Sequence, residues 1–185
     1  MGYAIAGELA RQGARVSLVS GPVKIPAQHP NIKVIKVVSA LEMFDRCTRI
    51  FPETDGAVMA AAVADFMPSF SSGEKIKRGD SELHIKLVPT KDIASELGKL
   101  KTGKQILVGF ALETHDELAN AGRKLRKKNL DFIVLNSLND AGAGFDVDTN
   151  KITILDKYNN RQVFQLKTKT EVAKDIVAQM VELMK

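Results

Sequence analysis

Hydrophobic residues recur along this chain with helical and strand-like spacings that alternate from one end to the other. Residues 3–10 carry apolar side chains at helical spacing, and Gly13 supplies a stop signal for that helix. The same patterns predict further helices at 40–48, 91–100, 116–129 and 171–184, and strands at 14–20, 32–38, 57–64, 83–88, 105–111 and 131–136. The chain is therefore expected to alternate strands with helices over most of its length.

The C-terminal part of the pattern departs from this alternation. Residues 152–155 and 162–166 predict a β-hairpin, because Asn159 and Asn160 between them suit a turn with positive φ. Thr168 and Glu171 have the spacing of a capping box and predict the start of the last helix. We expect an α/β, Rossmann-like fold of three layers with a mainly parallel sheet, followed by a C-terminal β-hairpin plus helix.

The first predicted element is a helix with no strand before it. A βαβ unit normally opens with a strand and a Gly-rich turn, so the first strand of the fold is expected to be missing from this chain. Residues 1–185 are interpreted as a single domain, N-terminally incomplete.

Two consecutive segments stand out within the predicted sheet. Residues 57–64 are apolar on both faces, which is typical of a central parallel strand covered by helices on each side. From 66 to 80 the composition changes to Pro, Ser, Gly and Lys and predicts a long loop, a feature that in compact domains is usually functional or disordered.

Charge and composition narrow the class of partner. Lys and Arg number 27 against 22 Asp and Glu, a formal charge of +5 that favours an anionic ligand. Aromatic residues make up only 5% with no Trp, so base-stacking surfaces are scarce and small anions are favoured over nucleic acid. A single cysteine, Cys47, excludes an intramolecular disulfide framework. No leader or membrane-length apolar run occurs, so a cytoplasmic protein with no membrane partner is expected.

Candidate chemistry lies at predicted strand ends, on the loop and on one helix. Asp65 follows small residues at a strand end, where it could bind a ligand or, equally, cap the loop. Lys75 lies on the loop and could neutralise a triphosphate, although a solvated surface loop explains it as well. Lys124 and Lys128 share a helix face that is either a phosphate grip or a solvated surface, and Phe110 contacts a base or the core.

Taken in order, these segments resemble the phosphopantothenate–cysteine ligase family, the synthetase half of the bacterial bifunctional coenzyme A biosynthesis protein. The matching stretches are 1–6, 16–22, 61–66, 74–77, 91–93, 108–114 and 124–131 with Asn136. Each is weak alone, but together they span nearly the whole chain. In that family an opening strand, a Gly-rich turn and an Asn-containing segment stand immediately before the position of Met1.

The resemblance implies a CTP-dependent ligase that forms an amide bond in coenzyme A biosynthesis. CTP would activate 4'-phosphopantothenate as an acyl-cytidylate, and the amine of L-cysteine would then displace CMP. Mg²⁺ would accompany the triphosphate, its protein ligands stay unassigned, and no flavin is expected in this domain. The resemblance also implies a homodimer, and it leaves open a flavin-dependent decarboxylase domain fused upstream.

The same resemblance assigns roles to individual positions. Lys75 would be the catalytic lysine of a loop that closes over the intermediate. The nucleotide-binding positions would be Ala60, Ala61, Asp65, Val88, Pro89, Thr90, Lys91, Phe110, Lys124 and Lys128. These roles require Asp65 and the Lys124–Lys128 pair to meet at one rim of the sheet.

Two other functions fit parts of the sequence. A nicotinamide-dependent oxidoreductase would share the fold, but its Gly-x-Gly-x-x-Gly fingerprint is not in this sequence. A non-catalytic nucleic-acid-binding module would explain the positive charge but not its patchy distribution. The hairpin at 152–166 offers an edge through which two copies could pair.

Overall fold

The computed structural model describes residues 1–78, 82–113, 116–137 and 147–185. The helices are α1 (Gly2–Arg11), α2 (Ala40–Ile50), the 3-10 helix η1 (Phe51–Glu53), α3 (Ile93–Leu100), α4 (Glu117–Lys127) and α5 (Lys169–Leu183). The strands are β1 (Val16–Ser20), β2 (Ile32–Lys36), β3 (Gly56–Met59), β4 (Phe66–Pro68), β5 (Leu87–Pro89), β6 (Ile106–Glu113), β7 (Phe132–Ser137), β8 (Thr149–Asn150), β9 (Ile152–Asp156), β10 (Arg161–Val163) and β11 (Lys167–Thr168). The predicted alternation of helix and strand is confirmed.

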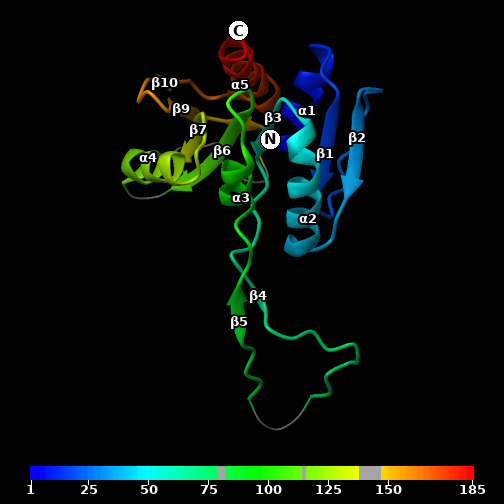
Figure 1. Ribbon diagram of the computed structural model, residues 1–185. Coiled ribbons are helices and arrows are strands. Elements are labelled where there is room, and N and C mark those ends of the chain that lie inside the picture. The colour runs from blue at the N-terminus through cyan, green and yellow to red at the C-terminus, as the bar shows by residue number, and fades with distance from the viewer. Residues whose placement is uncertain (79–81, 114–115, 138–146) are drawn as a thin grey trace.

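A five-stranded sheet forms the centre of the molecule, with the order β10-β9-β7-β6-β3 (Figure 1). Strands β3, β6 and β7 run parallel, and β9 and β10 are antiparallel additions at one edge. Strands β1 and β2 pair in parallel as a separate ladder. Within the described residues β3 is hydrogen-bonded to β6 alone and β1 to β2 alone. The expectation of a missing first strand stays a prediction.

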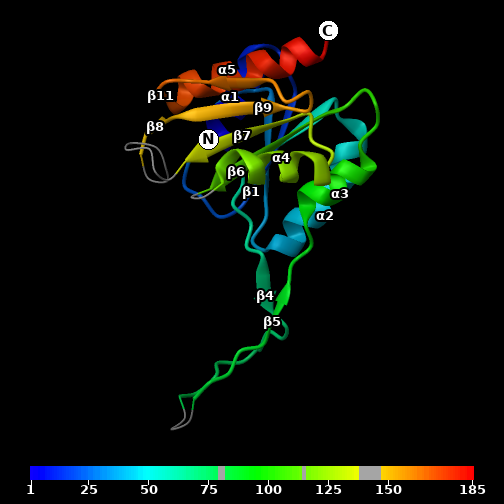
Figure 2. The same ribbon diagram turned by 90° about the vertical axis from the view of Figure 1, so that its left-hand side faces the viewer.

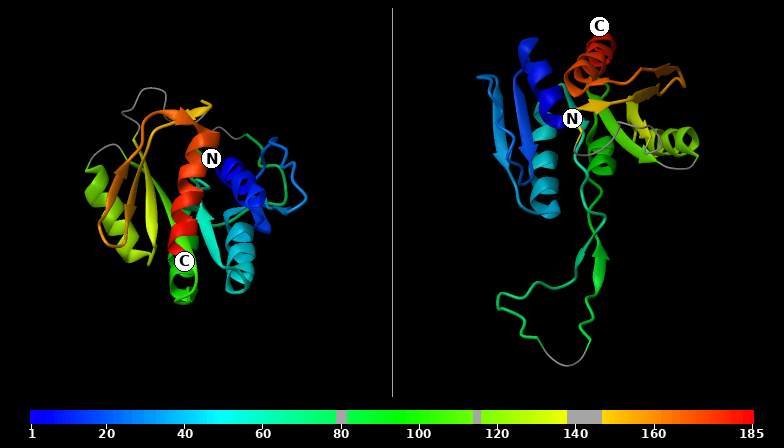
Figure 3. Two further views of the ribbon diagram at one scale, coloured as in Figure 1. Left: turned by 90° about the horizontal axis from the view of Figure 1, so that it is seen from above. Right: turned by 180° about the vertical axis from the view of Figure 1, so that it is seen from behind.

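Side chains of the central strands alternate between two helical layers, which confirms the three-layer fold. In β6 and β7 the residues Leu107 and Ile133 pack in one core cluster with α2, α3 and α4. Their neighbours Val108 and Phe132 pack in a second cluster with α1 and α5. Figure 3 shows α1 and α5 side by side over that second face. Burial of both strand faces explains why these strands are apolar along their whole length.

Turns and caps follow the predicted local chemistry. Gly13 has a φ of 94° directly after α1, and Asn159 has a φ of 66° in the hairpin between β9 and β10. Thr168 and Glu171 form both hydrogen bonds of a capping box at the start of α5. No helix in the described part of the chain combines the length and apolar character needed to cross a membrane.

Two predicted strands are shorter than the sequence pattern indicates. The strand predicted at 57–64 is confirmed only as far as Met59, because the alanine-rich residues after it leave the sheet and line a pocket. The strand predicted at 83–88 is wrong for most of its length, since only Leu87 and Val88 of it lie in β5. Gly79, Asp80 and Thr114, which the sequence interpretation included in its loop and motifs, lie outside the described residues.

The predicted loop after 66 forms a projecting arm. Strands β4 and β5 pair antiparallel at its base, and residues 69–78 and 82–86 extend away from the body (Figures 1 and 2). The described apolar side chains along it are largely solvent-exposed, with Phe70 at 77%, Leu83 at 66% and Ile85 at 63%. In residues 69–78 and 82–86 the arm therefore has no apolar face covered by its own domain.

A buried carboxylate ties several elements together at the amino ends of the strands. Asp131 accepts hydrogen bonds from the Leu107 amide at 2.8 Å and from Lys101 and Lys157 at 3.0 Å each. Burial alone would raise the pKa of Asp131, but these donors outweigh it and hold the pKa below its ordinary value. The charge is therefore kept inside the fold by its partners.

Helix α3 packs against the end of α4 at unusually close range. A Cβ atom at Gly98 would lie 2.1 Å from the carbonyl oxygen of Lys128, so only glycine fits there. The Gly98 carbonyl accepts a hydrogen bond of 2.9 Å from Asn129 Nδ2, and Asn129 has a φ of 51° just beyond α4. This contact sets the distance between the two helices.

We predict that Gly98→Ala destabilises the protein by about 2–3 kcal/mol, because the added methyl meets backbone rather than a flexible side chain. Gly7→Ala is the matched control, since Gly7 lies inside α1 with no atom within 4 Å of the added Cβ. That control should gain up to about 1 kcal/mol from helix propensity. Urea unfolding of both variants measures the difference, and equal stability of the two would contradict the packing argument.

Candidate functional site

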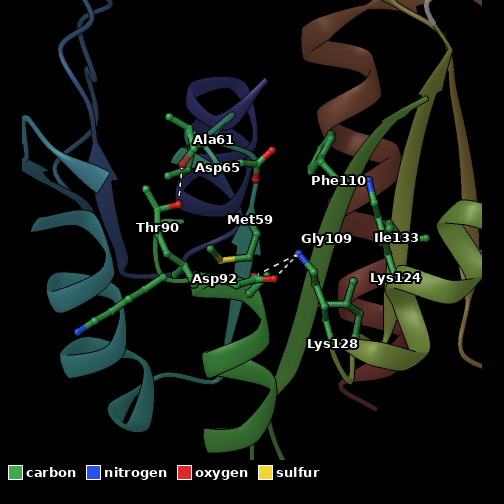
Figure 4. A pocket seen from close by; sticks show the side chains of 16 residues that line it. Met59, Ala61, Asp65, Thr90, Asp92, Gly109, Phe110, Lys124, Lys128 and Ile133 are labelled. Atoms are coloured by element: carbon green, nitrogen blue, oxygen red, sulfur yellow. Dashed lines mark hydrogen bonds and ion pairs between the residues drawn. The ribbon is translucent and has the colours of Figure 1, made fainter. Parts of the chain in front are cut away.

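A pocket opens between the carboxyl end of β3 and the start of α3. Its volume is about 200 Å³, and α4 forms the opposite wall (Figure 4). The lining residues are Met59, Ala61, Val63, Ala64, Asp65, Thr90, Lys91, Asp92, Ile93, Ala94, Gly109, Phe110, Lys124, Lys128, Leu130 and Ile133. This is the carboxyl rim of the parallel strands, where doubly wound sheets bind ligands.

Thr90 holds the segment that carries Asp65. Its hydroxyl donates to the carbonyl of Ala64 at 2.7 Å, and its amide donates to the carbonyl of Asp65 at 2.9 Å. Strands β4 and β5 continue this pairing directly beyond the pocket. The Asp65 backbone is thereby fixed although its side chain is exposed to solvent.

Helix α4 and its C-cap residue contribute two cations from one face. Lys124 and Lys128 are one helical turn apart, and Figure 4 shows both projecting into the pocket, Lys124 toward Phe110 and Lys128 toward Asp92. The Lys128 ammonium lies 3.0 Å from Asp92 Oδ2 and 3.2 Å from Oδ1. The predicted pairing of these lysines on one helix face is confirmed.

Asp92 is the N-cap of α3 and cannot turn freely. Its Oδ1 accepts the Ser95 amide at 3.0 Å, and its Oδ2 accepts the Ser95 hydroxyl at 2.8 Å. Burial alone would raise the pKa of Asp92, but the bonds from Ser95 and Lys128 and the charge of Lys128 outweigh it and hold the pKa below its ordinary value. Asp92 is therefore ionised at neutral pH and faces the pocket as a fixed carboxylate.

The remaining walls are apolar or only partly polar. The Lys91 ammonium lies 4.6 Å from the centre of the Phe44 ring, a cation–π contact that ties the pocket to α2. Gly109 forms part of the floor, where a Cβ atom would meet Leu130 Cδ1 at 2.5 Å. Phe110 lines the pocket, and its half-buried side chain also packs against the core cluster under α1 and α5.

The structure brings most of the predicted nucleotide-binding residues together. Ala61, Asp65, Thr90, Lys91, Phe110, Lys124 and Lys128 all line this one pocket, which places Asp65 and the two lysines around the same space. Their role in nucleotide binding stays a prediction.

The other predicted residues lie outside it. Ala60 sits beside α1, where its Cβ is 3.7 Å from the position that a Gly2 Cβ would take. Val88 and Pro89 are paired with β4. Lys75 is absent from the pocket lining and lies on the arm, which extends away from the body of the molecule (Figure 2).

The sequence interpretation missed Asp92 as a site residue. Its signal was present, because an Asp three residues before a Ser at a predicted helix start is typical of an N-cap, which places the carboxylate at the strand-to-helix crossing. Its partner Lys128 is 36 residues away, and no local pattern indicates that contact.

Asp65 and Asp92 supply the carboxylate oxygens of the pocket. No group of three or more His, Cys, Asp or Glu that could hold a metal ion occurs among the described residues. Mg²⁺ is commonly held by one or two carboxylates together with substrate phosphates, so the pocket fits a metal that enters with a phosphorylated ligand.

Comparison with known proteins identifies the family. Residues 1–184 match the model of the DNA/pantothenate metabolism flavoprotein C-terminal domain. The chain belongs to this family. It is 40% identical over 185 residues to the coenzyme A biosynthesis bifunctional protein CoaBC of Bacillus subtilis (strain 168), covering 100% of this chain and 45% of the relative. It is 56% identical over 183 residues to a cysteine/cysteine sulfinic acid decarboxylase from an unknown prokaryotic organism, covering 99% of this chain and 51% of that protein.

A solved structure confirms the fold of this family member. The crystal structure of the C-terminal domain of CoaBC superposes with a TM-score of 0.82 at 32% identity, covering 98% of this chain and 81% of that one. The chain spans about half the length of the curated relatives it matches.

We predict that Lys128→Gln raises the pKa of Asp92, because loss of the ammonium removes a hydrogen bond and a positive charge that favour the carboxylate. A lowered folded-state pKa means that the stabilisation is complete above the ordinary aspartate value of about 3.9 and is lost as pH falls through the folded value. The pKa of Asp92 is measured by following the ¹³C chemical shift of its carboxyl carbon against pH. Lys99→Gln, which removes the partner of Glu96 on the same helix, should leave the Asp92 titration unchanged.

Proposed function

We propose that this chain is a phosphopantothenate–cysteine ligase domain that uses CTP. The observation that carries the proposal is the meeting of Asp65, Phe110, Lys124 and Lys128 in one pocket at the carboxyl rim of the sheet. Family membership supports coenzyme A biosynthesis as the pathway, because the Bacillus subtilis relative is named for it.

In this proposal the pocket binds the nucleotide in two parts. Phe110 stacks on the base, and Asp65 with the backbone near Ala61 contacts the cytidine. Lys124 and Lys128 bind the phosphate oxygens, a role that suits ammonium groups on one helix face. When bound, Mg²⁺ would neutralise phosphate charge, and Asp65 and Asp92 are the residues that would hold it.

The reaction divides into two displacements. The carboxylate of 4'-phosphopantothenate attacks the α-phosphorus of CTP, which forms the acyl-cytidylate and releases pyrophosphate. The amine of L-cysteine then attacks the acyl carbon, which forms the amide and releases CMP, with one proton leaving the amine. Lys75, on the arm, would stabilise negative charge that develops on the phosphates when the arm moves over the pocket.

Pyrophosphate release tests the ligase reaction. It should require CTP, 4'-phosphopantothenate and Mg²⁺ together, and the amide product should require L-cysteine in addition. Replacing CTP by ATP in the same assay tests the base preference. Release that is independent of phosphopantothenate would count against a ligase.

We predict that Lys75→Ala lowers turnover by at least about a hundredfold while the affinity for CTP changes by less than about threefold, because a lysine that acts on developing charge stabilises the transition state more than the ground state. Lys77→Ala is the matched control on the same arm and should retain turnover within about threefold. A larger loss in the Lys77 variant than in the Lys75 variant would move the catalytic role to Lys77.

We also propose a homodimer formed through the arm. Leu83 and Ile85 are 66% and 63% exposed on an extended segment that its own domain does not cover, and exposed apolar stretches of this kind mark interaction surfaces. The hairpin edge at β10 is the other candidate, with Val163 at 52% exposure.

Sedimentation equilibrium distinguishes the two surfaces. Leu83→Glu combined with Ile85→Glu should convert the dimer to a monomer, because each carboxylate would be buried without a partner. Val163→Glu should leave the dimer intact. The reverse result would assign the interface to the hairpin, and a monomeric wild-type protein would exclude the dimer.

A further inference from the structure

The ammonium of Lys128 is already bound by a carboxylate inside the pocket. Asp92 contacts it through both oxygens at 3.0 and 3.2 Å. The Lys128 side chain is only 26% exposed, because it lies along the pocket wall and ends in this ion pair. A phosphate that approaches Lys128 must therefore compete with Asp92 or share the ammonium with it.

Asp92 cannot follow Lys128 when the lysine moves. Both of its oxygens are held by Ser95, one through the amide at 3.0 Å and one through the hydroxyl at 2.8 Å. Because the bond from the Ser95 amide also caps α3, turning the carboxylate away would leave that amide unpaired at the helix start. Displacement of Lys128 thus leaves a fixed negative charge that faces the ligand.

The charges that line the pocket decide how strongly the fixed Asp92 carboxylate repels a bound phosphate. Lys91, Lys124 and Lys128 are opposed by Asp65 and Asp92, and Lys91 rests on the Phe44 ring. A metal-free nucleoside triphosphate is more negative than its complex with a divalent cation. Repulsion from a fixed carboxylate therefore opposes the metal-free form more strongly.

We propose that Asp92 makes the pocket selective for the metal complex of its nucleotide over the metal-free nucleotide, by occupying Lys128 and by facing the phosphates as a carboxylate. This inference rests on the proposed nucleotide function. The metal complex would bring a cation close to Asp92, which already pairs with the Lys128 ammonium. Carboxylate oxygen is a ligand type that Mg²⁺ accepts. Asp92 is thus a specificity-determining residue rather than a catalytic one.

Calorimetric binding of CTP with Mg²⁺ and with EDTA tests the inference. Wild-type protein should bind the magnesium complex more tightly than free CTP. The Asp92→Asn variant should bind free CTP about three- to fivefold more tightly than wild type does, which is the size expected of a solvent-accessible charge pair. The ratio of the affinity for the magnesium complex to the affinity for free CTP should therefore fall. Asparagine is as good an N-cap as aspartate, so α3 should keep its start, and an unchanged thermal midpoint confirms it.

Two further variants separate the role of Asp92 from a general charge effect. Glu96→Gln removes a carboxylate from the same helix outside the pocket, where it pairs with Lys99 at 2.9 Å, and should leave the binding ratio unchanged. Lys128→Gln should weaken binding of both forms, and Asp92→Asn should then improve free-CTP binding less than it does when Lys128 is present.

The outcomes distinguish this inference from the proposed function. If wild-type protein binds CTP but Asp92→Asn keeps the wild-type ratio, the role of Asp92 is wrong while the nucleotide site stands. The same gain from Asp92→Asn with and without Lys128 would show that competition for the lysine is not the cause. If wild-type protein binds CTP in neither condition, the nucleotide function and this inference both fail.

Discussion

The geometry of the pocket depends on the contact between α3 and the end of α4. The backbone of Gly98 lies against the carbonyl oxygen of Lys128, at a distance that admits no side chain, and Asn129 locks the contact with a hydrogen bond. From that anchored backbone the Lys128 side chain reaches back along α3 to its first turn, where Asp92 meets it. The close packing of α3 against the end of α4 thus sets where the Lys128 ammonium lies.

The same arrangement holds the charged side chains of the pocket in defined positions. Lys128 is paired with a carboxylate that is itself fixed by a helix cap, and Lys91 rests on an aromatic ring. Pairing of this kind reduces the freedom that long side chains lose when they bind a ligand. The arm, in contrast, is an extended segment outside the body (Figure 1), and its sequence carries Lys75 and Lys77. The protein therefore combines a rigid binding surface with a projecting segment.

Local patterns predicted most of the helices and strands, but they extended the strand before Asp65 to residue 64, whereas β3 ends at Met59. They failed where apolar character did not mean pairing. The alanine run after Met59 looks like a continued strand, yet it forms a pocket wall, because small side chains suit both settings. Residues 82–86 alternate like a strand, but in the described structure only Leu87 to Pro89 form a strand ladder with β4. Propensity reports which residues tolerate a strand, and pairing requires an available neighbour.

The sequence by itself determined the order of helices and strands, the turns at Gly13 and Asn159, and the shared face of Lys124 and Lys128, because each depends on residues a few positions apart. The tertiary structure alone decided which of the predicted residues share a pocket, and that Asp92 holds Lys128 from 36 positions away. Such contacts arise from how helices pack on the sheet, and local periodicity carries no information about them.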